Sequence, residues 1–147
     1  MPSISTPSKI ASTQSLGANV VFSGSTAPER EAVKEKVQAE TGAFFIPPYD
    51  HPDIILGQGP VGLEMEQQYA ELGEGKVLDA VFTPIGGGGL NAGVATYFSQ
   101  EEGRPKTRVY GAEPSFEGAD DCRRGLAQGQ RIESVSTTTI ADGLRTP

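Results

Sequence analysis

The sequence predicts an α/β fold, a parallel sheet with flanking helices. Strand-like and helix-like segments alternate along the whole chain, which is the pattern of such folds. The segment at 76–85 has the near-continuous apolar run of a strand buried on both faces, as in parallel sheets. In order, the expected elements are a helix at 6–17, a strand at 18–22, a helix at 26–42, strand 43–48, helix 60–73, strand 76–85, helix 90–98, strand 107–114 and helix 118–129.

The boundaries of these elements rest on residues typical of helix and strand ends. Thr6 is a plausible N-cap, with Pro7 at the first helical position. Thr26 and Glu29 have the spacing of a capping box. The strand at 43–48 should end at two prolines. In the helix at 60–73 the apolar residues recur on one face, namely Val61, Met65, Tyr69 and Leu72.

Composition excludes several classes of function. The formal net charge is -7, and the 12 basic residues are scattered, which argues against nucleic acid or an anionic membrane as partner. The single cysteine, Cys122, rules out an internal disulfide and fits a reducing compartment. No apolar run is long enough to span a bilayer, and no targeting signal is visible at the N-terminus. We therefore expect a cytoplasmic protein that binds a small molecule.

Four consecutive glycines, 86–89, separate the apolar strand from the next helix. A glycine-rich turn between a strand and a helix directs backbone N–H groups and the positive end of the helix dipole at one point, where a phosphate fits. A flexible turn without a ligand is the alternative. The Lys-Ser/Thr pair of a Walker A loop is missing, and Glu113 is only loosely placed for the acidic residue of a dinucleotide fold.

Several motifs together resemble one family. The segments "PIGGGGLNAGVA", "GAEPSFEGADDC" and "TTIADGL", with "SKIASTQSLGANVVF" and "PPYDHPDIILGQGPVGLEM", are similar in order and spacing to the serine racemase and serine/threonine dehydratase family. Its members use pyridoxal phosphate in the tryptophan-synthase-β-like fold, called fold type II. The resemblance implies that residues 1–45 correspond to a remnant of the smaller domain and 46–147 to part of the larger cofactor-binding domain. We expect the two to form one compact unit.

The resemblance assigns cofactor contacts. It implies that Gly86, Gly87, Gly88 and Gly89, with the N–H of Leu90, hold the phosphate of pyridoxal phosphate, and that Gly143 lies beside the cofactor ring. In relatives that use a divalent cation, the corresponding segment supplies the ligands, so Glu113, Ala119 and Asp121 inherit a Mg²⁺ or Ca²⁺ site. Without the resemblance, the simpler interpretation is that these acidic residues lie in the first turn of a helix, face solvent and stabilise the helix dipole. The "FEG" at 116–118 lengthens this loop relative to some members.

Two other parts of the family's chemistry are not recognisable in the sequence. The family's Schiff-base lysine lies in a Ser-x-Lys-x-Arg-Gly type segment and a Ser-Gly-Asn type loop faces the ring; neither motif occurs here. We interpret the five lysines as solvent-exposed charges and not as the Schiff-base residue, namely Lys9, Lys34, Lys36, Lys76 and Lys106. Pro60 stands where relatives commonly have threonine. His51, between two aspartates, is a weak catalytic candidate that is more simply solvated, and Cys122 is more simply a small packing residue.

These observations favour a truncated relative of the pyridoxal-phosphate-dependent dehydratases and racemases. It keeps the phosphate loop and the cation loop but lacks the lysine, so any cofactor would bind non-covalently. One alternative is a remodelled isomerase, lyase or cyclase that works without pyridoxal phosphate. Another is a non-catalytic partner subunit. Because parallel strands without neighbours leave open edges, we expect a homo-oligomer or a complex with a completing chain.

Overall fold

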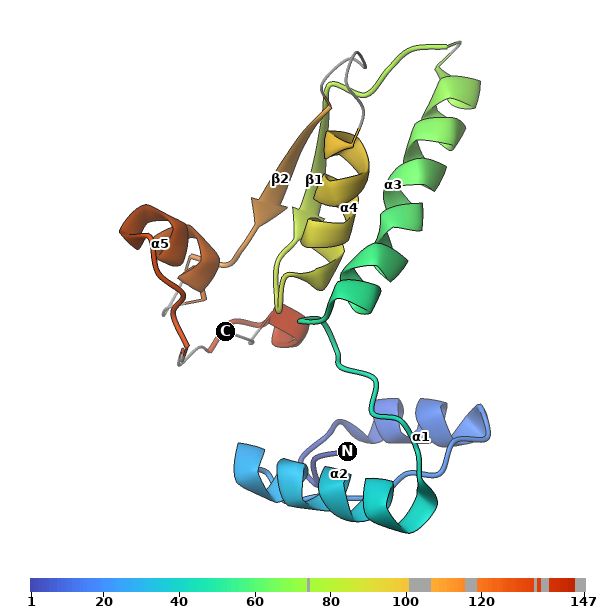
Figure 1. Ribbon diagram of the computed structural model, residues 1–147, viewed down its shortest axis with the longest axis vertical. Helices are drawn as coiled ribbons and strands as arrows, with labels where there is room; N and C mark the ends of the chain where they lie inside the picture. The colour runs from blue at the N-terminus through green and yellow to red at the C-terminus, as the bar shows by residue number, and fades with distance from the viewer. Residues whose placement is uncertain (74, 101–106, 116–118, 134, 136–137, 145–147) are drawn as a thin grey trace. The chain divides into compact units, whose positions relative to one another are not determined.

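The structure is a computed structural model that describes residues 1–73, 75–100, 107–115, 119–133, 135 and 138–144 (Figure 1). Contacts divide the chain into two compact units, Met1–Ile46 and Pro47–Pro147. The derivation of 1–45 and 46–147 from a smaller and a larger domain stays a prediction. None of the helices in the described ranges has the length and apolar character needed to cross a bilayer.

The N-terminal unit holds two helices, α1 (Pro7–Ser15) and α2 (Ala27–Thr41). The predicted capping box of α2 is confirmed, because the Thr26 side chain accepts from the Glu29 N–H while Glu29 accepts from the Thr26 N–H. The strands predicted at 18–22 and 43–48 are wrong: both segments run without a ladder. An isolated bridge joins Pro2 to Ser23. The apolar content of these segments misled the prediction, since a strand also needs a paired neighbour.

The C-terminal unit confirms the α/β prediction. Strands β1 (Ala80–Pro84) and β2 (Arg108–Ala112) pair in parallel, with Val81 opposite Val109, and α4 (Gly89–Ser99) connects them. Figure 1 shows α4 lying between the two strands and α3 (Pro52–Leu72). After β2 come α5 (Asp121–Gln128) and a 3₁₀ turn at Asp142–Leu144.

Helix α3 begins eight residues earlier than the sequence predicts. The prediction took Pro60 as a helix start, but Pro52 holds the first-turn position and Pro60 lies inside the helix. His51 is the N-cap, and its Nδ1 accepts the Asp53 N–H at 3.2 Å. Proline lacks an N–H, so it cannot bond the carbonyl four residues back and normally kinks a helix. Proline favours the first helical position, and the sequence offers two such prolines, of which Pro52 and not Pro60 begins the helix.

Glycines allow α3 and α4 to pack very closely. A Cβ on Gly93 of α4 would lie 2.4 Å from the Ile55 carbonyl oxygen of α3, and one on Gly62 would lie 2.8 Å from the Tyr97 ring. The Tyr97 hydroxyl adds a 2.6 Å hydrogen bond to the Glu66 carboxylate. Helix α4 is therefore fixed against α3 by backbone contact as well as by side chains.

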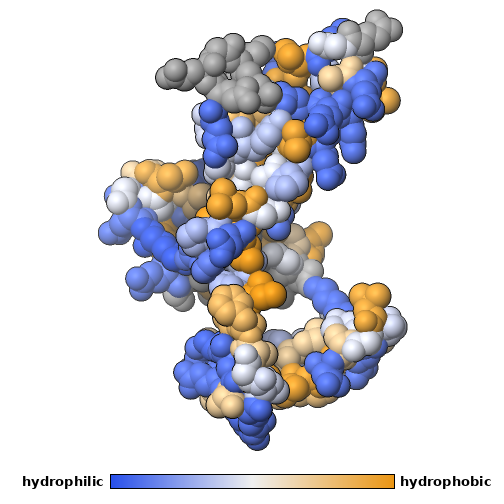
Figure 2. All heavy atoms as spheres, turned by 45° about the vertical axis from the view of Figure 1, so that its right-hand side comes forward, coloured by the Kyte–Doolittle hydropathy of each residue, from blue (hydrophilic) through white to orange (hydrophobic). Residues whose placement is uncertain are grey.

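The two faces of the sheet differ sharply. Val81 and Thr83 are 2% and 5% exposed on the side that α4 covers. On the opposite side Phe82 and Tyr110 stack with ring centroids 5.0 Å apart and remain 72% and 41% exposed. The prediction that this strand is buried on both faces is therefore wrong for the described residues. Figure 2 shows hydrophobic residues scattered across the visible surface.

Candidate functional site: a cavity at the glycine loop

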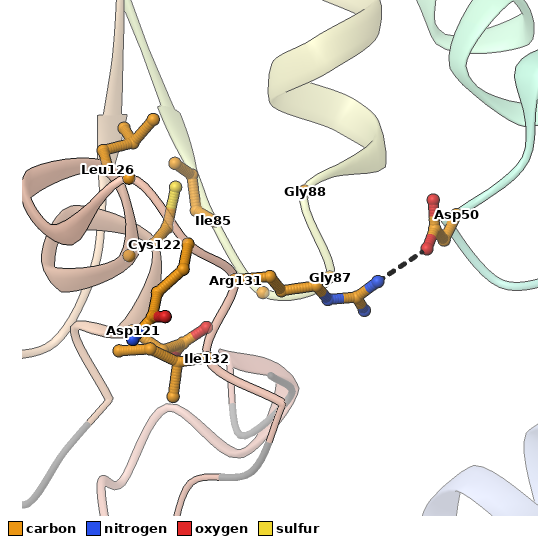
Figure 3. Close-up of a pocket in the computed structure, with 13 residues that line it drawn as sticks. Asp50, Ile85, Gly87, Gly88, Asp121, Cys122, Leu126, Arg131 and Ile132 are labelled. Atoms are coloured by element: carbon orange, nitrogen blue, oxygen red, sulfur yellow. Dashed lines mark hydrogen bonds and ion pairs between the residues drawn. The ribbon is translucent and has the colours of Figure 1, made fainter.

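A cavity of about 560 Å³ opens in the C-terminal unit where β1 ends (Figure 3). The glycine loop forms one wall, α5 and the segment after it form another, and Asp50 stands at one side. This position, beyond the carboxyl end of a parallel strand, is where ligands bind in open α/β sheets. The lining residues are Asp50, Ile85, Gly86, Gly87, Gly88, Asp121, Cys122, Gly125, Leu126, Gly129, Gln130, Arg131 and Ile132.

The glycine loop brings the N-terminus of α4 to the cavity wall. Gly88 is the N-cap and has φ 86, a left-handed conformation that favours glycine. Without a side chain it cannot cap the helix, and no side chain bonds in its place. The first N–H groups of a helix have no acceptor within the helix itself. The loop therefore presents backbone donors and the positive end of the helix dipole beside the cavity.

Tyr49 explains two of the four glycines without any ligand. A Cβ on Gly87 would lie 2.1 Å from Cγ of Tyr49, and one on Gly89 would lie 3.1 Å from the Tyr49 backbone. The close approach expected of these glycines is thus made at least partly to the chain itself. The positive φ of Gly88 is a third internal requirement. Tyr49 therefore packs against the loop but does not line the cavity.

The end of β1 holds the loop in place. The Ile85 N–H donates to the Ala112 carbonyl of β2 at 2.9 Å, which extends the ladder to the edge of the cavity. On the covered face of the sheet, the Asn91 amide of α4 donates to the buried Thr83 hydroxyl at 2.7 Å. The residue before the glycines is therefore bonded to β2, and the helix after them is bonded to β1, so both ends of the loop are held to the sheet.

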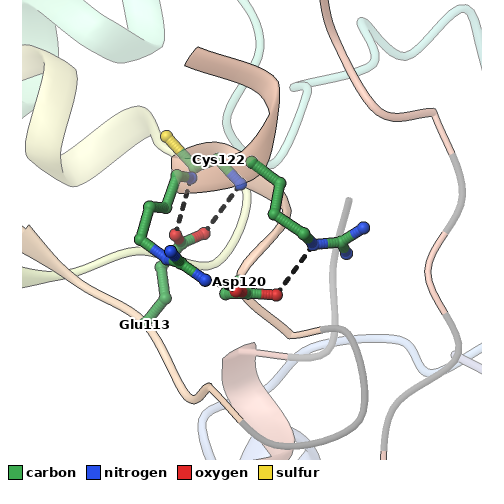
Figure 4. A network of polar contacts seen from close by, with 5 residues as sticks. Glu113, Asp120 and Cys122 are labelled. Atoms are coloured by element: carbon green, nitrogen blue, oxygen red, sulfur yellow. Dashed lines mark hydrogen bonds and ion pairs between the residues drawn. The ribbon is translucent and has the colours of Figure 1, made fainter. Parts of the chain in front are cut away.

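The N-terminus of α5 is already occupied by a carboxylate (Figure 4). Both oxygens of Glu113, just after β2, accept backbone N–H groups, from Cys122 at 3.0 Å and from Arg123 at 3.0 Å. The adjacent Asp120 accepts from the guanidinium groups of Arg123 and Arg124. These hydrogen bonds and charges, the bond from Arg123 first, lower the pKa of Asp120 below its usual value.

Asp121 and Cys122 face the cavity from the first turn of α5. Asp121 is 7% exposed, and no hydrogen bond or ion pair joins its carboxylate to another residue in the described ranges. Partial burial, followed by the charges of Glu113 and Asp121, raises the pKa of the Cys122 thiol. Cys122 is therefore held as a neutral thiol, in agreement with its interpretation as a packing residue.

The structure brings some of the predicted site residues together and leaves others apart. Gly86, Gly87 and Gly88 line the cavity, and Gly89 and Leu90 open α4 directly behind them. Asp121 lines the same cavity, while Glu113 and Ala119 lie beside α5 outside its lining. Gly143 lies in the 3₁₀ turn and His51 caps α3; neither lines the cavity.

The cavity contains two charged residues that sequence reasoning missed. Arg131, after α5, reaches across the cavity to Asp50, and the guanidinium and carboxylate are 3.1 Å apart (Figure 3). Eighty-one positions separate them, and no local pattern points to such a pair. None of the described lysines lines the cavity, namely Lys9, Lys34, Lys36 and Lys76. Lys106 and the "FEG" segment at 116–118 lie outside the described residues.

Comparison with known proteins decides the family. A family profile described as "Pyridoxal-phosphate dependent enzyme" matches residues 1–147, the whole chain. The chain belongs to this family. It is 38% identical over 144 residues to the threonine dehydratase of Nicotiana attenuata, matching 98% of this chain and 22% of that protein. It is also 38% identical over 137 residues to the serine racemase of Oryza sativa subsp. indica, matching 93% of this chain and 38% of that protein.

A solved structure supports the same placement within the family. Maize serine racemase superposes with a TM-score of 0.86 at 39% identity, covering 99% of this chain and 41% of that one. The predicted resemblance and the fold type II architecture are thereby confirmed. The chain spans less than half the length of these relatives.

Proposed function

We propose that this chain holds the phosphate group of pyridoxal phosphate, without a covalent bond, on the backbone of Gly86 to Leu90. The observation that carries the proposal is the N-terminus of α4: it has no side-chain cap and opens beside a cavity of about 560 Å³. Membership of the family makes pyridoxal phosphate the first candidate ligand. A phosphate dianion suits a helix N-terminus because it accepts several N–H bonds and complements the helix dipole.

The residues present can hold the phosphate of pyridoxal phosphate, but they do not supply the lysine that the family's reactions require. When bound, pyridoxal phosphate acts as an electron sink for amino-acid substrates. This chain supplies the anion site and part of the cavity wall, but no recognisable lysine segment. We propose that the lysine comes from polypeptide outside these 147 residues, and that the assembled protein acts on hydroxy amino acids as the dehydratases and racemases do. The elimination or racemisation step is then not performed by this chain alone.

Titration of the whole chain with pyridoxal phosphate, and in parallel with pyridoxal, tests the phosphate site. Backbone ¹⁵N–¹H NMR is the readout, and the amide signals of Gly86 to Leu90 should move with the phosphate ester but not with pyridoxal. Equal responses to both compounds would contradict the proposal. So would an unchanged loop.

A matched pair of variants at Gly88 isolates the charge. Aspartate and asparagine tolerate positive φ about equally well and have the same shape, so Gly88→Asp and Gly88→Asn should perturb the loop alike. The Asp variant places a carboxylate where the phosphate binds, so it should weaken binding roughly tenfold beyond the Asn variant, about 1.4 kcal/mol. Equal affinities for the two variants would count against an anion site here.

We also propose a divalent cation at the start of α5, held by Glu113, the Ala119 carbonyl and Asp121. These are hard oxygen donors of the kind that Mg²⁺ and Ca²⁺ prefer. The buried Asp121 carboxylate, which has no polar partner among the described residues, supports the proposal. Glu113 would have to share its oxygens between the cation and the α5 amides.

Cation binding has a direct readout in the same spectra. Addition of Mg²⁺ or Ca²⁺ should shift the amide signals of Cys122 and Arg123, which Glu113 holds, and Asp121→Asn should abolish the response. Glu133→Gln, which removes an exposed carboxylate after α5, is the matched control and should keep it. A response that survives Asp121→Asn would exclude this ligand set.

A second candidate function is that of a partner subunit completed by another polypeptide. The open face of the sheet favours it: Phe82 and Tyr110 stack there while 72% and 41% exposed. Apolar aromatic surface of this kind stabilises association when it is covered. The relatives' greater length is consistent with additional polypeptide over this face. We propose that a completing chain, or a second copy of this one, covers it.

Light scattering over a concentration series tests the association. The chain alone should form oligomers that Phe82→Ser weakens, or it should gain stability only with a completing chain. Phe44→Ser, which removes a phenylalanine of the N-terminal unit that is 81% exposed, is the control. A stable monomer whose unfolding is unaffected by any added family fragment would contradict the proposal.

A further inference from the structure

We propose that Arg131 is a phosphate ligand of the cavity and that Asp50 is its counter-ion when the phosphate is absent. The inference rests on the proposed phosphate site and adds a charged residue to it. In this arrangement the guanidinium moves from Asp50 to the phosphate as the ligand binds. The Asp50 carboxylate is therefore a competing internal anion that lowers the affinity of the site by a small factor.

The charge of the cavity carries the first step of the argument. Among the described residues, three charged side chains line it: Asp50, Asp121 and Arg131, which together leave a net negative charge. The whole chain also carries a formal charge of -7. The two carboxylates oppose the entry of a dianion, and a cation beside the loop amides would offset that repulsion. In the part of the chain that the structure describes, Arg131 is the one basic side chain that lines the cavity.

The position of Arg131 carries the second step. Its side chain extends from the segment after α5 toward Asp50, with which it pairs at 3.1 Å (Figure 3). It lines the same cavity as Gly86, Gly87 and Gly88. A guanidinium is always charged and its planar fork matches a phosphate with two parallel N–H bonds. The loop amides and Arg131 would hold the anion from different sides.

The exposure of the ion pair carries the third step. The Arg131 and Asp50 side chains are 64% and 66% exposed, and the pair joins them at 3.1 Å. Exposed pairs of this kind contribute little because water screens them. Breaking the contact is therefore easy, and Asp50 returns to solvent without a buried charge being left behind. A dianion that already accepts loop N–H bonds should win the guanidinium from a single exposed carboxylate.

Three variants of the full chain test the assignment, with inorganic phosphate and pyridoxal phosphate as the probes and calorimetry as the readout. Arg131→Gln should weaken both probes about tenfold, and Arg131→Lys should recover part of the loss because it keeps the charge but not the fork. Asp50→Asn should tighten both by a factor of about two to five, since it removes the competing anion. A double variant that combines Arg131→Gln with Asp50→Asn completes the set. In the Arg131→Gln background, Asp50→Asn should tighten binding much less than it does in the unaltered chain.

Matched controls separate the local contact from bulk charge. Arg108→Gln on β2 and Asp53→Asn on α3 make the same charge changes outside the cavity lining, and both should change affinity less than twofold at moderate salt. If Arg131→Gln behaves like Arg108→Gln while Gly88→Asp still weakens binding, the role of Arg131 is overturned and the phosphate site stands. If the unaltered chain binds neither probe, the phosphate site fails and the inference fails with it.

Discussion

The N-termini of α4 and α5 lie beside the same cavity but are satisfied in opposite ways. At α5 the carboxylate of Glu113 accepts two backbone N–H groups, so the chain supplies its own anion. At α4 the N-cap is Gly88, which has no side chain to offer. Both helices follow strands of the same parallel sheet. The comparison teaches that the residue at the helix start decides whether the first N–H groups are satisfied by the chain itself or left open to a ligand.

Substitution at Gly87 tests the internal role of the α4 loop most strongly. Its added Cβ would lie 2.1 Å from Cγ of Tyr49, so we expect Gly87→Ala to destabilise the chain by about 2 kcal/mol through overpacking. Urea unfolding measures this. Gly57→Ala, a helical site where a Cβ meets nothing within 4 Å, should instead be neutral or slightly stabilising.

The same site gives a test of cause. In a Tyr49→Ala background the cost of Gly87→Ala should fall, because the ring that it would strike is gone. An unchanged cost would mean that the glycine is required for another reason. The α4 loop would then be shaped by something other than Tyr49.

Removing the internal anion makes α5 resemble α4. Glu113→Gln keeps the shape of the side chain but loses its charge, so we expect a loss of about 1 kcal/mol in the free energy of unfolding. Hydrogen exchange at the Cys122 and Arg123 amides should accelerate in the folded state. Glu133→Gln serves as the control, and equal exchange in both variants would contradict the capping role.

The comparison also predicts how Cys122 reacts. Partial burial and the nearby carboxylates raise its pKa above the ordinary value of 9.0, so the thiolate should be scarce near neutral pH. Alkylation at about pH 8 should run several-fold slower in the folded chain than in urea, with its midpoint shifted to higher pH. In the Glu113→Gln variant the midpoint should move back toward the ordinary value. A folded-chain midpoint below that of the unfolded chain would refute this account.

The smallest expected effect concerns Asp120. Its pKa is lowered from 3.8, so its contribution to stability is complete above that value and is lost as the pH falls through the lower folded value. Asp120→Asn should therefore reduce stability at about pH 6, and this difference should shrink as the pH is lowered toward about 2. Urea unfolding at both pH values measures this. Asp53→Asn, with no such arginine pair, should lack the difference.

Sequence patterns predicted those parts of the fold whose cause is local. The capping box at Thr26 and Glu29 and the glycine start of α4 depend on neighbours a few residues away, and both were found. The strands at 18–22 and 43–48 were wrong because pairing depends on partners that apolar content does not reveal. The exposure of Phe82 was not predicted for a similar reason: the second face of the sheet is buried only if another element packs on it, and the apolar content of the strand does not reveal that element.

The candidate site also has a part that depends on local sequence and a part that depends on the fold. The glycine loop is continuous in sequence, so its composition and position identified it. The Arg131 and Asp50 pair comes from residues 81 positions apart, brought together only by the packing of the C-terminal unit. Tyr49 likewise takes its place against Gly87 through the fold. Neither contact leaves a periodic or spacing signal.

The glycine contact between α3 and α4 has a consequence for mutational screens. Gly62 and Gly93 touch a neighbouring ring and a neighbouring carbonyl, and any side chain there would force the helices apart. Because α4 carries the loop on its first turn, such a displacement would also move the loop that we propose as the anion site. In a saturation library scored by ligand capture, these two positions should therefore rank with direct contacts, although neither lines the cavity.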